Sequence, residues 1–277
     1  MKIKELLKTI CLLSCAAFLL SCASSAPVPQ AAAFQMSDFS HTIPLFQDDS
    51  GLKPCMNFSF SLLETIGSQE DIRFINDSLY QGQNPAQYRD AVIQDWQARY
   101  LENRDLAASQ DPVPEVLNWE YWETMEFNLL KDRGLVLRRE IYAYTGGAHG
   151  MTQIKYFVFD LAAHRILKFS DFFREDTAER LQGIVIEGLR RYNNTQDGPK
   201  LSENQPLSQG IFSTDTPGLP DIFFINSEGF GLQWAQYDIA PYMAGAIGII
   251  LPWREIRPLL KHDTMELLEK FGIPMFI

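Results

Sequence analysis

The sequence predicts an α+β fold in which antiparallel β-meanders pack with amphipathic helices, in two closely associated sub-domains. Three observations support this prediction. Apolar and polar residues alternate over 119–129, apolar residues recur at helical spacing in other segments, and the two patterns are segregated along the chain. Strict alternation of strands and helices would instead indicate a doubly wound parallel sheet.

The first sub-domain is expected to span residues 37–150, and it begins with two strands. Segments 39–46 and 55–63 are strand-like and flank a turn-rich stretch. A helix is predicted from Pro85, because Asn84 is a favourable N-cap and proline suits the first helical position. Its apolar stripe consists of residues at four-residue spacing: Tyr88, Val92, Trp96 and Tyr100.

The clearest strand signal lies at 119–129, where the odd positions are mostly apolar and the even positions mostly polar. A turn at 132–134 leads to a second strand at 135–144, and a turn at 145–150 leads to a third at 151–160. These three segments form a predicted antiparallel meander with one buried face.

The second sub-domain is expected to span residues 151–277. It contains an amphipathic helix with apolar residues on its inner side: Leu181, Ile184, Val185, Leu189 and Tyr192. Residues 193–220 are polar and rich in Gly, Pro, Ser and Thr, which indicates a long loop. The remaining predicted elements are strands at 221–225, 230–234 and 246–251 and helices at 253–257 and 263–271.

The N-terminal segment, residues 1–21, has the parts of a lipoprotein signal peptide. Three lysines precede the apolar run 9–20, which is shorter than the roughly 20 residues that a spanning helix requires. The Leu-Leu-Ser immediately before Cys22 resembles the lipobox at which lipoprotein signal peptidase cuts. We therefore predict that Cys22 is acylated, as by palmitate, and that residues 22–36 form a flexible tether. An ordinary signal peptide cleaved within 23–26 is the alternative.

The chain is acidic, with a formal charge of −11 at pH 7. Removal of residues 1–21 takes away three lysines and one glutamate and leaves −13. Such a surface disfavours nucleic acid and anionic lipid and attracts cationic partners. The predicted lipid anchor leads us to expect the protein in the cell envelope, attached to a bacterial membrane on its periplasmic side or at the cell surface.

Neither a cofactor nor a metal site is predicted. The sequence lacks the common nucleotide-binding, zinc-protease and nucleophile-elbow motifs. Once Cys22 carries lipid, only Cys55 remains in the mature chain, which excludes an internal disulfide and a Cys-rich zinc site. The four histidines are isolated from one another: His41, His149, His164 and His262.

Two loop segments are the candidate binding residues. In the first, Tyr144, Gly146, Gly147 and His149 lie between two predicted strands, where the glycines supply the positive φ angles of a tight turn. They either serve turn geometry alone or present the tyrosine and the histidine to a partner.

The second candidate segment lies at 237–245, before an apolar strand. Pro241 and Gly245 restrict and then free the backbone, which gives the loop a defined shape. Tyr237 and Tyr242 either pack against the protein or act as amphipathic anchors in an interface.

These segments resemble a known family. The motifs YTGGAHG at 144–150, FSDFF at 169–173, YDIAPYMAG at 237–245 and IILPW at 249–253 are similar to those of the extracellular module of the anti-sigma factor RsiV. The same module precedes the catalytic domain of PdaC-type peptidoglycan deacetylases. The resemblance covers about 39–260 and implies an α+β fold.

The resemblance also implies a binding role. The RsiV branch uses the module to bind lysozyme, and the deacetylase branch carries it beside an enzyme that acts on cell-wall glycan. We expect this chain to lack the sigma-binding segment, the membrane span and the deacetylase domain of those relatives. The binding role of the module alone is therefore expected here.

We favour binding over catalysis as the function. The leading hypothesis is a lipid-anchored envelope protein that recognises a lysozyme-like muramidase or peptidoglycan through the two loops. One alternative is an envelope hydrolase with His149 as general base near a carboxylate such as Asp160 or Asp238. The other alternative is a purely structural envelope lipoprotein.

Overall fold

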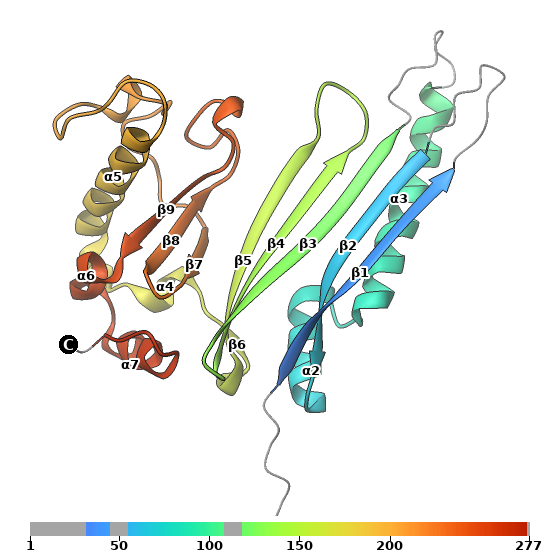
Figure 1. The fold of residues 1–277 in the computed structure, drawn as a ribbon, viewed down its shortest axis with the longest axis horizontal. Helices are drawn as coiled ribbons and strands as arrows, with labels where there is room; N and C mark the ends of the chain where they lie inside the picture. Colours follow the sequence, from blue (N-terminus) through green and yellow to red (C-terminus); the bar gives the residue numbers. More distant parts are fainter. Residues whose placement is uncertain (1–31, 45–54, 108–117, 276–277) are drawn as a thin grey trace, which may run out of the picture. The chain divides into compact units, whose positions relative to one another are not determined.

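The computed structural model describes residues 32–44, 55–107 and 118–275 of the 277-residue chain. It confirms the predicted α+β fold, with two antiparallel-rich sheets and helices packed on them (Figure 1). The large sheet contains β1 (Ala33–Pro44), β2 (Cys55–Ile66), β3 (Trp119–Leu130), β4 (Gly134–Tyr144), β5 (Met151–Asp160) and β6 (Arg165–Ile166). The small sheet contains β7 (Ile222–Ile225), β8 (Gly229–Trp234) and β9 (Ile247–Pro252). The helices are α2 (Gln69–Tyr80), α3 (Pro85–Ala107), α4 (Phe169–Phe172), α5 (Ala178–Thr195), α6 (Trp253–Ile256) and α7 (His262–Lys270).

Strands of the large sheet follow one another in chain order. The predicted meander is confirmed, because β3, β4 and β5 pair antiparallel along their lengths. β2 and β3 are parallel, which the sequence pattern did not indicate. A parallel pair needs a crossover connection. Helices α2 and α3 supply it and cover one face of the sheet.

Helix α2 was missed by the sequence prediction. Its N-cap is Ser68, whose Oγ accepts a hydrogen bond of 3.1 Å from the backbone N–H of Asp71. The Ser68 hydroxyl donates in turn to the Asp71 carboxylate at 2.6 Å, and this hydrogen bond lowers the pKa of Asp71. The helix buries Ile75 and Leu79 against the sheet, and its C-cap is Gln81, which has a φ of 57°.

One hydrophobic core lies between the large sheet and these two helices. The predicted stripe of α3 packs into it, with Tyr100 fully buried and Trp96 edge-on to Trp119 at a centroid distance of 5.5 Å. The predicted N-cap is also confirmed, because the Asn84 side chain accepts a hydrogen bond from the backbone N–H of Gln87.

A buried carboxylate, Glu123, joins the sheet to the helices inside this core. Its Oε1 lies 2.8 Å from Nε of Arg139, without hydrogen-bond alignment, and its Oε2 accepts hydrogen bonds from the hydroxyls of Tyr88 and Tyr121. Burial and, secondly, the charge of Glu123 raise the pKa of Tyr88 to about 12 and also raise the pKa of Tyr121. Both tyrosines therefore remain neutral donors at physiological pH.

A second core surrounds the small sheet. β8 is buried along its whole length, and the predicted inner side of α5 is confirmed by the burial of Leu181, Val185 and Leu189. The small sheet meets β5 of the large sheet where Tyr156 stacks on Phe224, with ring centroids 4.6 Å apart. Gly231 permits this arrangement, because a Cβ there would lie 2.2 Å from the Phe224 ring.

The expected limits of the tether and of the sub-domains differ from the observed elements. Cys22 lies outside the described residues, whereas β1 begins at Ala33, so the last positions of the predicted tether at 22–36 are strand. The division between residues 150 and 151 falls inside the large sheet, because β5 pairs with β4. Ala32–Ile277 forms one compact unit. Within the described segments, no helix is long and apolar enough to cross a membrane.

Replacing Arg139 with methionine is expected to destabilise the fold by about 3–5 kcal/mol, because the buried Glu123 loses its charge partner. The double variant Arg139→Met/Glu123→Gln should recover part of this loss. Urea unfolding measures both, and Arg254→Met, which removes an 83% exposed arginine, should cost little. Equal costs for Arg139→Met and Arg254→Met would contradict the assigned role of the buried pair.

Ser68→Ala is expected to lower the free energy of unfolding by about 1 kcal/mol at pH 7, because α2 loses its N-cap. The pKa of Asp71 is lowered in the folded state, so its contribution is present above its ordinary pKa of 3.8 and is lost as the pH falls through the folded value. The difference between wild type and variant should therefore shrink near pH 3 in urea titrations. Ser78→Ala, within the same helix, should show no such pH dependence.

Candidate functional site

The loop between β4 and β5, residues 145–150, is a tight turn shaped by its glycines. Gly146 and Gly147 have φ angles of 91° and 99°, a region that residues with a Cβ rarely adopt. The hydroxyl of Tyr144 donates a 3.0 Å hydrogen bond to the Gly147 carbonyl and so closes the turn from its start. The half-buried Tyr144 therefore holds the loop in shape.

His149 is exposed at the end of this turn. Its Nδ1 lies 3.1 Å from the carbonyl oxygen of Gly150, a contact that is a hydrogen bond in the tautomer with the proton on Nδ1. The ring is thereby oriented, and Nε2 is left without a partner among the described residues.

The loop between β8 and β9, residues 235–246, is held by its own hydrogen bonds. The Asp238 carboxylate accepts from the backbone N–H of Ala235 at 2.8 Å, and the carbonyl of Ala235 accepts from the N–H of Asp238. Tyr237 lies within this turn at a φ of 75°, an uncommon conformation for a bulky side chain. Backbone strain of this kind, at an exposed aromatic residue, is typical of functional loops.

The two loops meet although they are far apart in the sequence. The rings of His149 and Tyr242 stack with centroids 4.5 Å apart and planes 28° apart. Tyr237 continues the row, with its centroid 5.3 Å from that of Tyr242. Tyr237 is 55% exposed, and the neighbouring Met243 is 95% exposed. We call His149, Tyr237, Tyr242 and Met243 the aromatic ridge.

The structure thus brings together some of the predicted site residues and gives others a supporting place. His149, Tyr237 and Tyr242 belong to the ridge, and the exposed Pro241 directly precedes the short 3₁₀ helix Tyr242–Ala244. Tyr144, Gly146 and Gly147 shape the first loop. Met243 was missed, because a lone apolar residue in a loop gives no sequence signal of its exposure.

The hydrolase alternative requires a carboxylate beside His149. In the described part of the chain, none lies within 4.0 Å of its ring nitrogens. Asp160 is engaged instead with Arg133, whose Nε lies 3.1 Å from its Oδ1, and Asp238 is engaged with Ala235. Across the described segments, no three His, Cys, Asp or Glu side chains gather as a metal site would require.

Residues 170–254 match the family model described as Protein of unknown function (DUF3298). The match includes the second loop of the ridge and leaves the first loop outside it. No protein of curated function matches the sequence.

Two solved structures of DUF3298 family proteins share this fold. The one from Bacteroides fragilis NCTC 9343 is 20% identical, with a TM-score of 0.73 over 88% of this chain and 97% of that chain. The one from Pseudomonas aeruginosa PAO1 is 15% identical, with a TM-score of 0.57 over 85% of this chain and 97% of that chain. Identities this low establish the fold and leave the function to be argued from the site.

Substituting Gly147 with alanine should destabilise the fold by about 1–2 kcal/mol, because its φ of 99° is strained for any residue with a Cβ. No neighbour lies within 4 Å of the added Cβ, so the cost is conformational. Gly183→Ala is the matched control, since its Cβ also meets nothing but its backbone is helical. That change should stabilise the protein by about 0.5–1 kcal/mol. Urea unfolding that gives both changes the same sign would contradict the assigned geometry of the turn.

Proposed function

We propose that this DUF3298 protein is a lipid-anchored binding protein of the bacterial cell envelope whose aromatic ridge docks onto a cationic, lysozyme-like protein. The observation that carries the proposal is the convergence of both predicted loops on one exposed row of rings. A row of this kind supplies large contact area from side chains with few rotatable bonds, as the anchor residues of interfaces do.

Exposure and strain in the ridge support a role outside folding. Met243 and Tyr237 leave apolar surface in water, and the φ of Tyr237 costs free energy on the order of 1–3 kcal/mol. The fold gains little from keeping either residue there. Exposed apolar groups at a shaped loop tip are typical of a binding surface.

Net charge favours a basic partner. The formal charge of −11 over the whole chain steers cationic proteins toward this one and speeds their encounter. Lysozymes are basic proteins, and the RsiV branch of the resembling module binds lysozyme. The DUF3298 domain is the shared element on which this part of the proposal depends.

The lipid anchor is a separate part of the proposal. It is supported by the order of apolar run, Leu-Leu-Ser and cysteine that ends at Cys22. In a bacterium expressing the full chain, mass spectrometry should find the mature N-terminus at an acylated Cys22. Cys22→Ser should abolish the acylation and release the protein from the membrane fraction. A mature N-terminus downstream of Cys22 would contradict the anchor and leave the ridge unaffected.

Lysozyme retention by the full chain at physiological salt tests the ridge. The double variant Tyr237→Ser/Met243→Ser should bind lysozyme at least about tenfold more weakly, because it removes exposed contact area without changing charge. Leu101→Ser is the matched control, since Leu101 is 50% exposed on α3, away from the ridge. Absence of retention by the wild type, or equal weakening by the control, would refute this function.

A further inference from the structure

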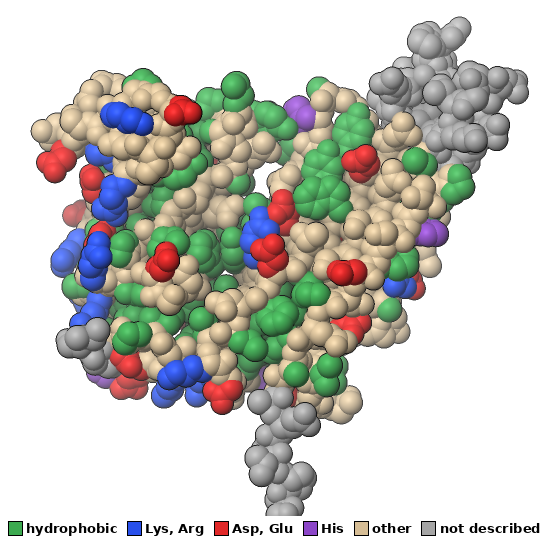
Figure 2. Space-filling model, in the orientation of Figure 1, with side chains coloured by type: hydrophobic (Ala, Val, Ile, Leu, Met, Phe, Trp, Pro, Cys, Tyr) green, Lys and Arg blue, Asp and Glu red, His purple; other side chains and the backbone are tan. Residues whose placement is uncertain are grey.

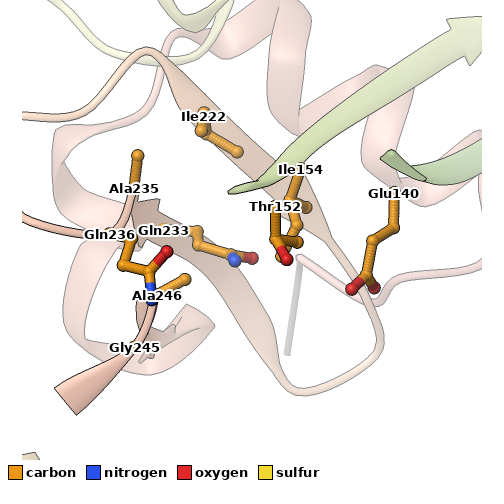
Figure 3. A pocket seen from close by; sticks show the side chains of 9 residues that line it. All are labelled: Glu140, Thr152, Ile154, Ile222, Gln233, Ala235, Gln236, Gly245 and Ala246. Atoms are coloured by element: carbon orange, nitrogen blue, oxygen red, sulfur yellow. The ribbon is translucent and has the colours of Figure 1, made fainter. Parts of the chain in front are cut away.

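A cavity of about 250 Å³ lies between the two sheets (Figure 3). Its polar lining comes from Glu140 on β4, Thr152 on β5, Gln233 on β8 and Gln236 in the second loop. The remaining lining is aliphatic: Ile154, Ile222, Ala235, Gly245 and Ala246. The space-filling view shows the molecule hollowed between the sheets (Figure 2).

Gln233 is the most informative residue of the lining. Its side chain is only 9% exposed and points from β8 into the cavity toward Thr152 and Glu140 (Figure 3). Among the described residues, no hydrogen-bond partner satisfies this amide. The amide lines the cavity, so it is left to form hydrogen bonds with water or with a ligand there. Gln233 is thus positioned for a ligand that both donates and accepts hydrogen bonds.

The other polar groups extend the same chemistry. Gln236 donates through Nε2 to the Tyr242 carbonyl at 3.4 Å, which fixes its side chain and leaves its Oε1 as an acceptor. Glu140 is held in an ion pair with Arg138 and retains free acceptor positions. Thr152 offers a hydroxyl. The cavity thus presents both donors and acceptors between aliphatic walls.

A stacked aromatic pair borders the cavity on the large sheet. Trp122 and Tyr142 are partly exposed, with centroids 4.9 Å and planes 17° apart. In the sheet register Tyr142 pairs with Thr152, so the rings lie on the face that the cavity uses. Gly150 admits the Tyr142 ring, because a Cβ there would lie 2.3 Å from its Cζ. The C–H face of a sugar ring is apolar and packs well on such a surface.

We infer that the cavity is a binding site for one sugar residue of a glycan, with the Trp122–Tyr142 pair as the platform for the adjoining residue. Sugar hydroxyls match the mixed donors and acceptors of the lining. The volume lies below the roughly 300 Å³ at which sites for drug-sized ligands begin, which suits one ring. No lysine or arginine lines the cavity, and Glu140 faces it, so anionic ligands are disfavoured.

This site is distinct from the aromatic ridge and does not depend on the proposed protein partner. The ridge is formed by the outer residues of the two loops, whereas the cavity uses the ends of the second loop and the strands beneath it. Sugar binding and lysozyme binding can therefore fail separately.

Titration of the full chain with the trisaccharide of N-acetylglucosamine, and with cellotriose, tests the inference. We expect saturable binding of at least one of these sugars in the millimolar range or tighter, measured by calorimetry. Gln233→Leu should weaken it at least about tenfold, because the buried amide is replaced by a side chain of similar size that forms no hydrogen bond. Gln153→Leu, at an exposed position on β5 outside the cavity lining, should leave affinity unchanged.

Amide NMR spectra of the wild type provide a second measurement that needs no variant to fold. The side-chain resonances of Gln233 and Gln236 should shift on sugar addition. The ridge variant Tyr237→Ser/Met243→Ser should bind sugar like the wild type. The inference is overturned by the absence of sugar binding, by shifts that spare both glutamines, or by equal weakening in Gln233→Leu and Gln153→Leu.

Discussion

The stack of Tyr156 on Phe224 is the contact on which the arrangement of this protein depends. It joins the large sheet to the small one, and it exists only because Gly231 leaves room for the phenylalanine ring. Once the sheets are fixed at this point, the β4–β5 turn and the β8–β9 loop come within contact, and His149 meets Tyr242. The cavity lies between the same strands. Both candidate sites thus depend on the contact between Tyr156 and Phe224.

Strands β3 to β5 of the large sheet carry packed side chains on both of their faces. One face buries apolar side chains and the Glu123–Arg139 pair against α2 and α3. The other face carries the Trp122–Tyr142 pair and the residues that meet the small sheet. A rigid, doubly used sheet of this kind holds loops in fixed positions, which lowers the entropic cost of binding through them. The Glu123–Arg139 pair thus lies on the face of the sheet opposite the cavity.

Much of this fold follows from local sequence patterns. Period-two alternation predicted the meander, and Asn84 with Pro85 predicted the start of α3. Helix α2 was missed although Ser68 and Asp71 form its N-cap. The helix has only 12 residues, so few apolar positions follow the cap to reveal a helical period. The parallel pairing of β2 with β3 was not predictable, because two strands that pair across a long crossover have no local sequence pattern in common. For the sites, the turn glycines identified the loops, but their contact and the inward direction of Gln233 arise from tertiary packing.

The parallel pairing of β2 and β3 has a consequence for how the chain reaches its final form. During synthesis β1 and β2 are made long before β3. The edge of β2 that later pairs with β3 therefore has no partner strand for that time. The meander pairs strands that are adjacent in sequence and closes quickly, whereas the edge of β2 is covered only after two helices have crossed over. That interval is when the nascent protein is most prone to pair with a foreign strand, and shielding by a chaperone would matter most then.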